Sequence, residues 1–219
     1  MPRTWYNSVT HNSWGKTYSE AVTFDVSYSE NERQERIKRI KEGQECRERK
    51  IKIFSSSITR DIKLDSFNDD IKVGTAEIHS FKGKKAKFIT KYMYPHLEDG
   101  DANTVILAAG GNDIPKRRAS LKELHDIANS LIDGALDCRN KYGVSKVCIS
   151  SILPRAYCDF QANRHQLNGI LKDLCKKNNV LFIENSNIIL KRHIHYDGVH
   201  LNAAGSKIFR ENLLSVLND

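Results

Sequence analysis

The sequence contains no run of about 18 apolar residues, the length that a helix needs to cross a bilayer. Its start, MPRTWYNSVTHNSW, also lacks the apolar stretch of a secretory signal. These two absences predict a protein that neither spans a membrane nor is secreted. We therefore expect it inside the cell, in the cytoplasm or the nucleus.

The sequence has few cysteines, and their number and spacing do not suggest a structural role. The five cysteines are odd in number and form no CxxC pair, so the sequence indicates neither a disulfide framework nor a zinc cluster. Reduced thiols in an intracellular protein are the interpretation that we prefer. The five are Cys46, Cys138, Cys148, Cys158 and Cys175.

The composition is that of a globular protein with a basic surface. Hydrophobic residues make up 39% and charged residues 28% of the 219 residues, which is enough to bury a core. The formal net charge is +8, and nearly all of it lies on residues 50–219, because Lys and Arg almost balance Asp and Glu in residues 1–49. A basic surface attracts nucleic acid, anionic lipid or acidic substrates.

The pattern of polar and apolar residues changes near Lys50. Residues 1–49 form a polar and charged extension, partly helical, in which residues 30–50 are dense in Glu, Lys and Arg and predict a solvated, charged connector. Residues 50–219 alternate short β-branched runs with amphipathic stretches. That alternation predicts one α/β domain, a three-layer α/β/α sandwich around a central parallel sheet.

The expected elements follow from the two hydrophobic periods. Five apolar runs predict the strands, at residues 50–54, 75–80, 104–108, 146–152 and 180–184. Two helices are indicated by apolar residues that recur on one face, namely Leu121, Leu124, Ile127, Leu131 and Leu136 in the first and Leu167, Ile170, Leu171 and Leu174 in the second. A last helix is expected over residues 203–217.

Unusual polar residues occupy four junctions where chemistry is expected. In open α/β sheets ligands bind where strands end and loops begin, so these junctions are examined first. Their sequences are Ile53-Phe54-Ser55-Ser56-Ser57-Ile58-Thr59-Arg60, Phe81-Lys82-Gly83, Ala109-Gly110-Gly111-Asn112-Asp113 and Tyr196-Asp197-Gly198-Val199-His200.

In this order the four junctions resemble the conserved blocks of the SGNH (GDSL-like) hydrolase family, over about residues 50–219. The Leu167-Asn168-x-x-Leu171 and Leu201-Asn202-x-x-Gly205 patterns look like the family too. The resemblance implies a flavodoxin-like strand order and a serine esterase without metal or organic cofactor. It makes Ser57 the nucleophile, Asp197 the orienting acid and His200 the base. Ser57, Gly83 and Asn112 would donate hydrogen bonds to the oxyanion.

The chemistry of these residues supports the same roles. A serine hydroxyl is a weak nucleophile until an adjacent base removes its proton, and His200 is such a base. Asp197 lies three positions earlier, with Gly198 between them, so its carboxylate can reach and orient the imidazole. Backbone N–H groups and an Asn amide are the donors that a tetrahedral intermediate needs.

One departure from the family concerns the residues before Ser57. The family has Gly-Asp there, whereas this chain has Ser55-Ser56. The Gly that eases a tight turn and the Asp that anchors it are both absent. Two functions therefore stay open: an active esterase, and a non-catalytic SGNH-like module that binds nucleic acid. The domain also looks like SGNH domains in open reading frames of mobile elements, and proteins that resemble this family and bind RNA exist.

Basic residues flank three of the four junctions. We expect them to form one anion-binding rim, which would select an anionic ester or a nucleic-acid backbone. The alternative is scattered solvated charge. The rim comprises Lys82, Lys84, Lys85, Lys87, Lys116, Arg117, Arg118, Lys191 and Arg192.

A metal site is the competing interpretation of the histidines near residue 200. His193, His195 and His200, with Asp197, are residue types that bind zinc. Nothing elsewhere in the sequence supplies a scaffold for such a site, so we interpret His193 and His195 as loop residues and expect no metal.

Overall fold

The computed structural model describes residues 49–157 and 159–218. The extension predicted for residues 1–49 lies outside this range except for Arg49, as do Cys46 and Cys158. No helix among the described residues has the length and apolar character required to traverse a bilayer.

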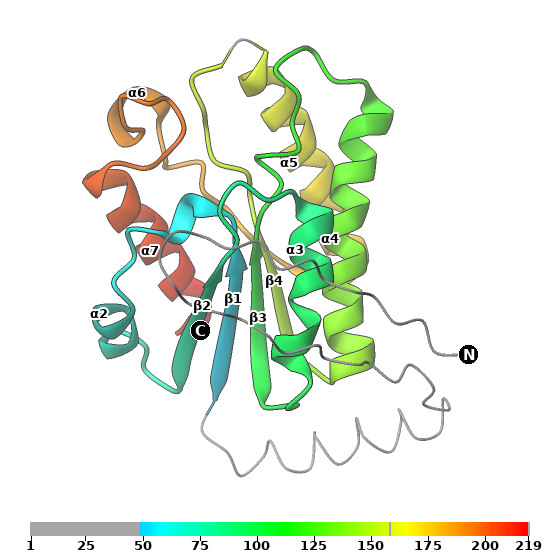
Figure 1. The fold of residues 1–219 in the computed structure, drawn as a ribbon, viewed down its shortest axis with the longest axis vertical. Coiled ribbons are helices and arrows are strands. Elements are labelled where there is room, and N and C mark those ends of the chain that lie inside the picture. The colour runs from blue at the N-terminus through cyan, green and yellow to red at the C-terminus, as the bar shows by residue number, and fades with distance from the viewer. Residues whose placement is uncertain (1–48, 158, 219) are drawn as a thin grey trace, which may run out of the picture.

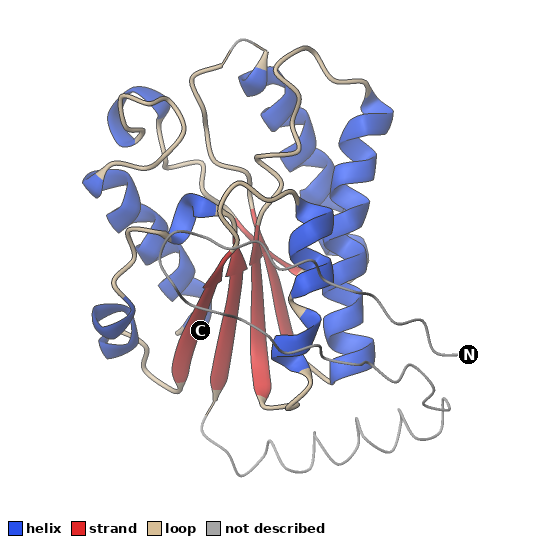
Figure 2. Ribbon diagram, viewed as in Figure 1, coloured by secondary structure: helices blue, strands red, loops and turns tan. Residues whose placement is uncertain are grey.

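A five-stranded sheet forms the centre of the domain (Figures 1 and 2). All neighbouring strands are parallel, and their order is β2-β1-β3-β4-β5, which confirms the predicted flavodoxin-like arrangement. The strands are β1 (Lys50–Ser55), β2 (Thr75–Ser80), β3 (Ala102–Ala108), β4 (Lys146–Ser150) and β5 (Leu181–Ile183).

Strands β4 and β5 end at Ser150 and Ile183, before the predicted ends at residues 152 and 184, and side chains bond to the backbone just beyond both strands. The backbone of Ile152 exchanges two hydrogen bonds with the Asn168 side chain, at 2.7 and 3.1 Å. The N–H of Asn185 donates to Ser151 Oγ at 3.0 Å. The Asn of the Leu167-Asn168 pattern therefore holds the loop that follows β4.

Helices cover both faces of the sheet, which gives the predicted three layers (Figure 1). One face packs against α3 (Ala86–Tyr92), α4 (Leu121–Tyr142) and α5 (Phe160–Lys177), and the other against α2 (Leu64–Asp69) and α7 (Ala203–Leu217). The strand residues alternate accordingly, with Ile51 and Ile53 on the α7 side and Phe54 on the α4 side.

The long helices bury most of the predicted stripe. In α4, Leu124 and Leu131 are fully buried and Leu136 is half-buried. Leu121 was expected on the same face, but it is 63% exposed and is the first residue of α4. The helix begins with a capping box between Ser120 and Glu123.

The periodicity did not indicate the short elements. These are α2, α3, α6 (Leu190–His193) and the 3₁₀ turns η1 (Ser57–Thr59) and η2 (Tyr94–Leu97). Each is too short to show a repeating apolar stripe in the sequence. The last helix, α7, has the predicted bounds. Because the strands are parallel, the loops that follow them meet at one edge of the sheet.

Candidate active site

A chain of hydrogen bonds joins Ser57, His200 and Asp197 at that edge. Ser57 Oγ lies 3.1 Å from His200 Nε2, and His200 Nδ1 lies 2.7 Å from Asp197 Oδ2. Ser57 begins η1 directly after β1, whereas Asp197 and His200 come from the loop between α6 and α7. The fourth sequence block therefore follows a helical turn, and not a strand as the sequence suggested.

The loop that carries Asp197 and His200 is fixed from two sides. Asp197 Oδ1 accepts hydrogen bonds from the N–H groups of Val199 and His200, at 2.8 and 3.0 Å. Gly198 has a φ of 71°, and a Cβ there would lie 2.9 Å from Ala156 Cβ, so only Gly fits. Its carbonyl accepts from the Ala156 N–H at 2.7 Å, which ties this loop to the one after β4.

The same contacts determine the charge of Asp197. Hydrogen bonds from the His200 N–H, the His200 side chain and the Val199 N–H hold the pKa of the Asp197 carboxyl well below its usual range. The carboxylate is therefore charged at neutral pH, and it holds the imidazole so that Nδ1 carries a proton and Nε2 faces the Ser57 hydroxyl.

Serine and threonine side chains hold the turn that lacks Gly-Asp. The Ser56 carbonyl accepts hydrogen bonds from Ser80 Oγ at 2.8 Å and from Ser55 Oγ at 3.0 Å, and Ser55 Oγ also contacts Thr59 Oγ1. Ser56 has a φ of −77°, which needs no Gly. Within the described part of the chain the hydrogen bonds at Ser56 involve its backbone and not its hydroxyl. The side chains of Ser55, Ser80 and Thr59 therefore stabilise the turn before Ser57. Ser80 and Thr59 were not singled out from the sequence.

The three predicted oxyanion donors, Ser57, Gly83 and Asn112, lie on the loops that follow β1, β2 and β3. Among residues 49–157 and 159–218, no acceptor is recorded for the backbone N–H of Ser57 or of Gly83. Asn112 Nδ2 donates to the Lys84 carbonyl at 3.0 Å, which leaves its second N–H, and Asn112 Oδ1 accepts from Arg155 Nη2 at 2.8 Å. Asn112 thus links the loops that follow β2, β3 and β4.

Arg155, which the sequence analysis did not single out, lines a pocket beside Ser57. The pocket is bounded by Ser56, Ile58, Ala108, Ala109, Gly111, Ser151, Ile152, Leu153, Arg155 and Val199. Arg155 is 8% exposed, and burial lowers the pKa of its guanidinium. Its position after the fourth strand was the available signal, since that junction ends at the same edge as the others.

Asp113, the last residue of the Gly-Gly-Asn-Asp block, has a structural contact. Its Oδ2 accepts from the Ala86 N–H at 2.8 Å, at the start of α3. Burial raises the pKa of Asp113 to about 6, against the opposing effects of that hydrogen bond and of the nearby Lys85 and Arg155 charges. Asp113 therefore joins the loop after β3 to α3.

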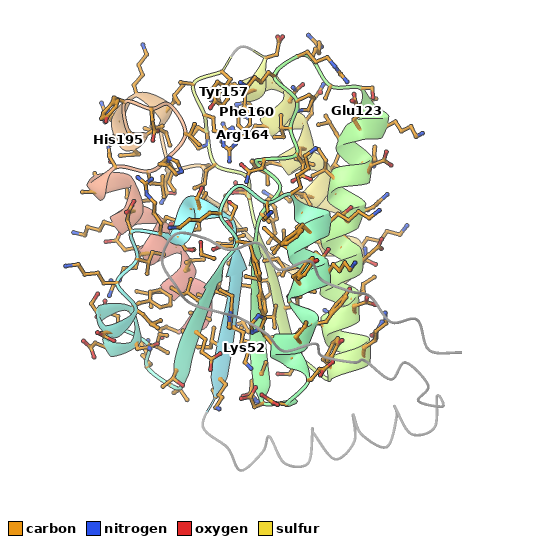
Figure 3. All side chains as sticks on the ribbon, in the orientation of Figure 1. Lys52, Glu123, Tyr157, Phe160, Arg164 and His195 are labelled. Atoms are coloured by element: carbon orange, nitrogen blue, oxygen red, sulfur yellow. The ribbon has the colours of Figure 1, made fainter. Side chains whose placement is uncertain are left out.

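The predicted rim residues all lie exposed on loops and short helices at this edge. Lys84 Nζ lies 4.7 Å from the centre of the Phe88 ring, and Lys116 Nζ lies 5.4 Å from the centre of the Tyr157 ring. Figure 3 labels Tyr157 on the loop before α5. Arg117 is already paired with Glu123 through both of its terminal nitrogens. Three of the rim side chains therefore already contact other residues of this protein.

Two of the three histidines that suggested a metal site, His195 and His200, lie near Asp197, whereas His193 bonds elsewhere. His193 Nδ1 accepts from the Ile189 N–H at 2.9 Å, and His195 Nδ1 lies 3.7 Å from Asp197 Oδ2. Figure 3 labels His195 beside α6. The described part of the chain contains no group of three or more His, Cys, Asp or Glu side chains that would hold a metal ion.

Comparison with known proteins places the fold. No family model matches the chain, and no curated protein matches it. Solved structures do, among them a lipase/acylhydrolase from Enterococcus faecalis, at 15% identity with a TM-score of 0.63, covering 78% of this chain and 95% of that one. A GDSL-like lipase from Bacteroides thetaiotaomicron matches at 18% identity and TM-score 0.62, covering 83% and 96%.

An acetylxylan esterase from Geobacillus stearothermophilus is similar in the same way, at 15% identity and TM-score 0.63, covering 78% of this chain and 94% of that one. Identities this low carry no activity across, but the agreement in structure does identify the architecture. This protein has the fold of the SGNH hydrolases.

Proposed function

We propose that this protein is a serine esterase that hydrolyses a carboxylic ester, with acetyl esters as the first candidates, through an acyl-enzyme on Ser57. The observation that carries the proposal is the hydrogen-bonded chain from Ser57 Oγ through His200 to Asp197. Nucleophile, base and orienting carboxylate are then all within the distances that such chemistry requires. The esterases and lipases of the same fold are consistent with it.

The proposed reaction proceeds in two steps. Ser57 Oγ attacks the ester carbonyl while His200 Nε2 takes its proton, and the N–H groups of Ser57, Gly83 and Asn112 bind the oxyanion. His200 then gives the proton to the departing alcohol, which leaves the acyl group on Ser57. Water, activated by His200, releases the acid and regenerates Ser57.

The first test is turnover of short neutral esters, such as ethyl acetate and 4-nitrophenyl acetate, followed by base uptake at constant pH. We expect hydrolysis that continues unchanged after EDTA is added, because no step uses a metal. If the folded protein, present at micromolar concentration, hydrolyses neither ester, the proposal is contradicted.

A second candidate is a non-catalytic module that binds single-stranded nucleic acid. The observation that favours it is the exposed rim, where Lys84 and Lys116 lie over the aromatic rings of Phe88 and Tyr157. Lysines track phosphates and aromatic rings stack on bases, which is how such surfaces bind single strands.

Charge reversal separates the two functions. The variant with Lys84→Glu, Arg117→Glu and Lys191→Glu should lose most oligonucleotide affinity if the rim tracks phosphates. The slope of log affinity against log salt should then fall by about one for each contact removed.

The matched control for this variant reverses Lys141, Lys176 and Lys177, which are exposed at the ends of α4 and α5, away from the site. If the protein is an esterase alone, oligonucleotides bind weakly to parent and variant alike, as a fluorescence anisotropy titration would show. If both variants bind and hydrolyse like the parent, the rim is only a solvated surface.

A further inference from the structure

Arg155 is a buried cation that forms no ion pair with the described residues. Only 8% of the residue is exposed, yet none of the carboxylates in residues 49–157 and 159–218 comes within 4.0 Å of its guanidinium nitrogens. Asp113 is near enough to act on it electrostatically, but the Asp113 hydrogen bond goes to Ala86. A buried charge without a paired charge is costly, so its presence needs an explanation.

The Arg155 guanidinium packs between Gly111 and the Phe160 ring. A Cβ on Gly111 would lie 2.9 Å from Arg155 Nη2 and 3.2 Å from its Cζ, so the guanidinium lies close against the backbone of the second Gly in the Gly-Gly-Asn-Asp block. On another side the Arg155 Cζ lies 5.5 Å from the centre of the Phe160 ring. The group is held in one place between the loops that follow β3 and β4.

Its hydrogen-bonding capacity is mostly unused by the described protein. A guanidinium has five N–H groups, and the one recorded hydrogen bond is from Nη2 to Asn112 Oδ1. Arg155 also lines the pocket beside Ser57, whose other walls are largely apolar, namely Ile58, Ala108, Ala109, Ile152, Leu153 and Val199. A fixed planar cation in an apolar pocket matches a carboxylate, which accepts two parallel hydrogen bonds from it.

We propose that Arg155 binds a carboxylate carried by the ester substrate, so that the enzyme selects anionic over neutral esters. The inference rests on the proposed function, because it names the class of ester that the site takes. It differs from the exposed rim in mechanism. The rim attracts any anion through solvent and salt screens it, whereas Arg155 recognises one group at one position and is sheltered from salt.

The test compares esters that differ only in charge. Monoethyl succinate and ethyl succinamate carry a carboxylate or a carboxamide of the same shape on the acid side, and 4-acetoxybenzoate and 4-acetoxybenzamide carry them on the alcohol side. In at least one pair we expect the parent to prefer the carboxylate by about ten- to hundredfold in kcat/KM, the range for a hydrogen bond to a charged group.

Arg155→Met should abolish that preference mainly through a raised KM, and Arg155→Lys should restore part of it. Since Arg155 also holds Asn112, kcat is expected to fall for all four esters, but a merely structural role would leave the ratio within each pair unchanged. Lys122→Met is the matched control, because it removes one exposed charge from α4 and should keep the full preference. If Arg155→Met fails to fold, Gly111→Ala, which crowds the guanidinium, should reduce the same ratio.

The inference is overturned if the parent hydrolyses both members of both pairs equally well, or if the preference survives in Arg155→Met. If no ester is hydrolysed at all, the proposed function fails while the inference can still be judged by binding. Calorimetry should then show that 4-acetoxybenzoate binds the parent at least tenfold more tightly than Arg155→Met. Equal binding, or none to either protein, would overturn the anion site as well.

Discussion

Replacing Ser57 with Ala should remove nearly all ester hydrolysis, with kcat falling by up to about 10⁶-fold, as happens when a serine hydrolase loses its nucleophile. His200→Ala should cost about as much, because it removes the base that lies 3.1 Å from Ser57 Oγ. The double variant should be hardly worse than either single one. Residues that act as one unit give effects that do not add.

The neighbouring serines provide the control for this prediction. Ser56→Ala removes a hydroxyl that has no recorded partner in the described residues, so it should leave kcat/KM within a fewfold of the parent. Ser55 is less suitable, because its hydroxyl bonds to the Ser56 carbonyl and to Thr59. Initial rates with 4-nitrophenyl acetate measure all of these variants. Full activity in Ser57→Ala, with loss of activity in Ser56→Ala, would show that Ser56 and not Ser57 is the nucleophile.

The second large effect is expected for Asp197→Asn. The amide keeps the size of the side chain and an oxygen for the N–H groups of Val199 and His200, but it loses the charge that stabilises the imidazolium. An Nδ2 placed opposite His200 Nδ1 would also favour the tautomer with its proton on Nε2, which cannot accept from Ser57. A fall of about 10⁴-fold in kcat is the effect known for such a change in a serine protease.

His195→Gln is the matched control, since His195 Nδ1 lies 3.7 Å from the same Asp197 oxygen. If Asp197 serves His200, His195→Gln keeps most of the activity while Asp197→Asn loses it. Stopped-time assays at pH 7.5, with circular dichroism to verify folding, measure both. An Asp197→Asn variant with a kcat within tenfold of the parent would show that this carboxylate does not orient the base.

The sequence was sufficient to predict the sheet and the loops that meet at its edge. Parallel strands with crossover helices leave few arrangements, so the order β2-β1-β3-β4-β5 followed from the alternation and the resemblance together. The bounds of α7 were also predicted correctly, because its apolar residues recur over 15 residues.

What the sequence missed depends on tertiary contacts. Ser80 bonds to a residue 24 positions away, and Arg155 to one 43 positions away, so neither pattern shows in a local window. The predicted ends of β4 and β5 were too late, and just beyond the observed ends the backbone of Ile152 and Asn185 bonds to the Asn168 and Ser151 side chains. Ser55-Ser56 was interpreted as a weakened turn, whereas bonds from Ser55, Ser80 and Thr59 compensate for the missing Gly-Asp.

The central claim is that the Ser57 hydroxyl is activated by His200, and covalent labelling by a fluorophosphonate tests it most directly. Such a reagent phosphonylates an activated serine, releases fluoride and adds a fixed mass, which intact-protein mass spectrometry reads without knowledge of the natural substrate. We expect one adduct on the parent, mapped to Ser57 by peptide analysis, and none on Ser57→Ala or His200→Ala. A parent that stays unlabelled under conditions that label a known serine esterase, or a Ser57→Ala variant that is labelled equally, would contradict the account.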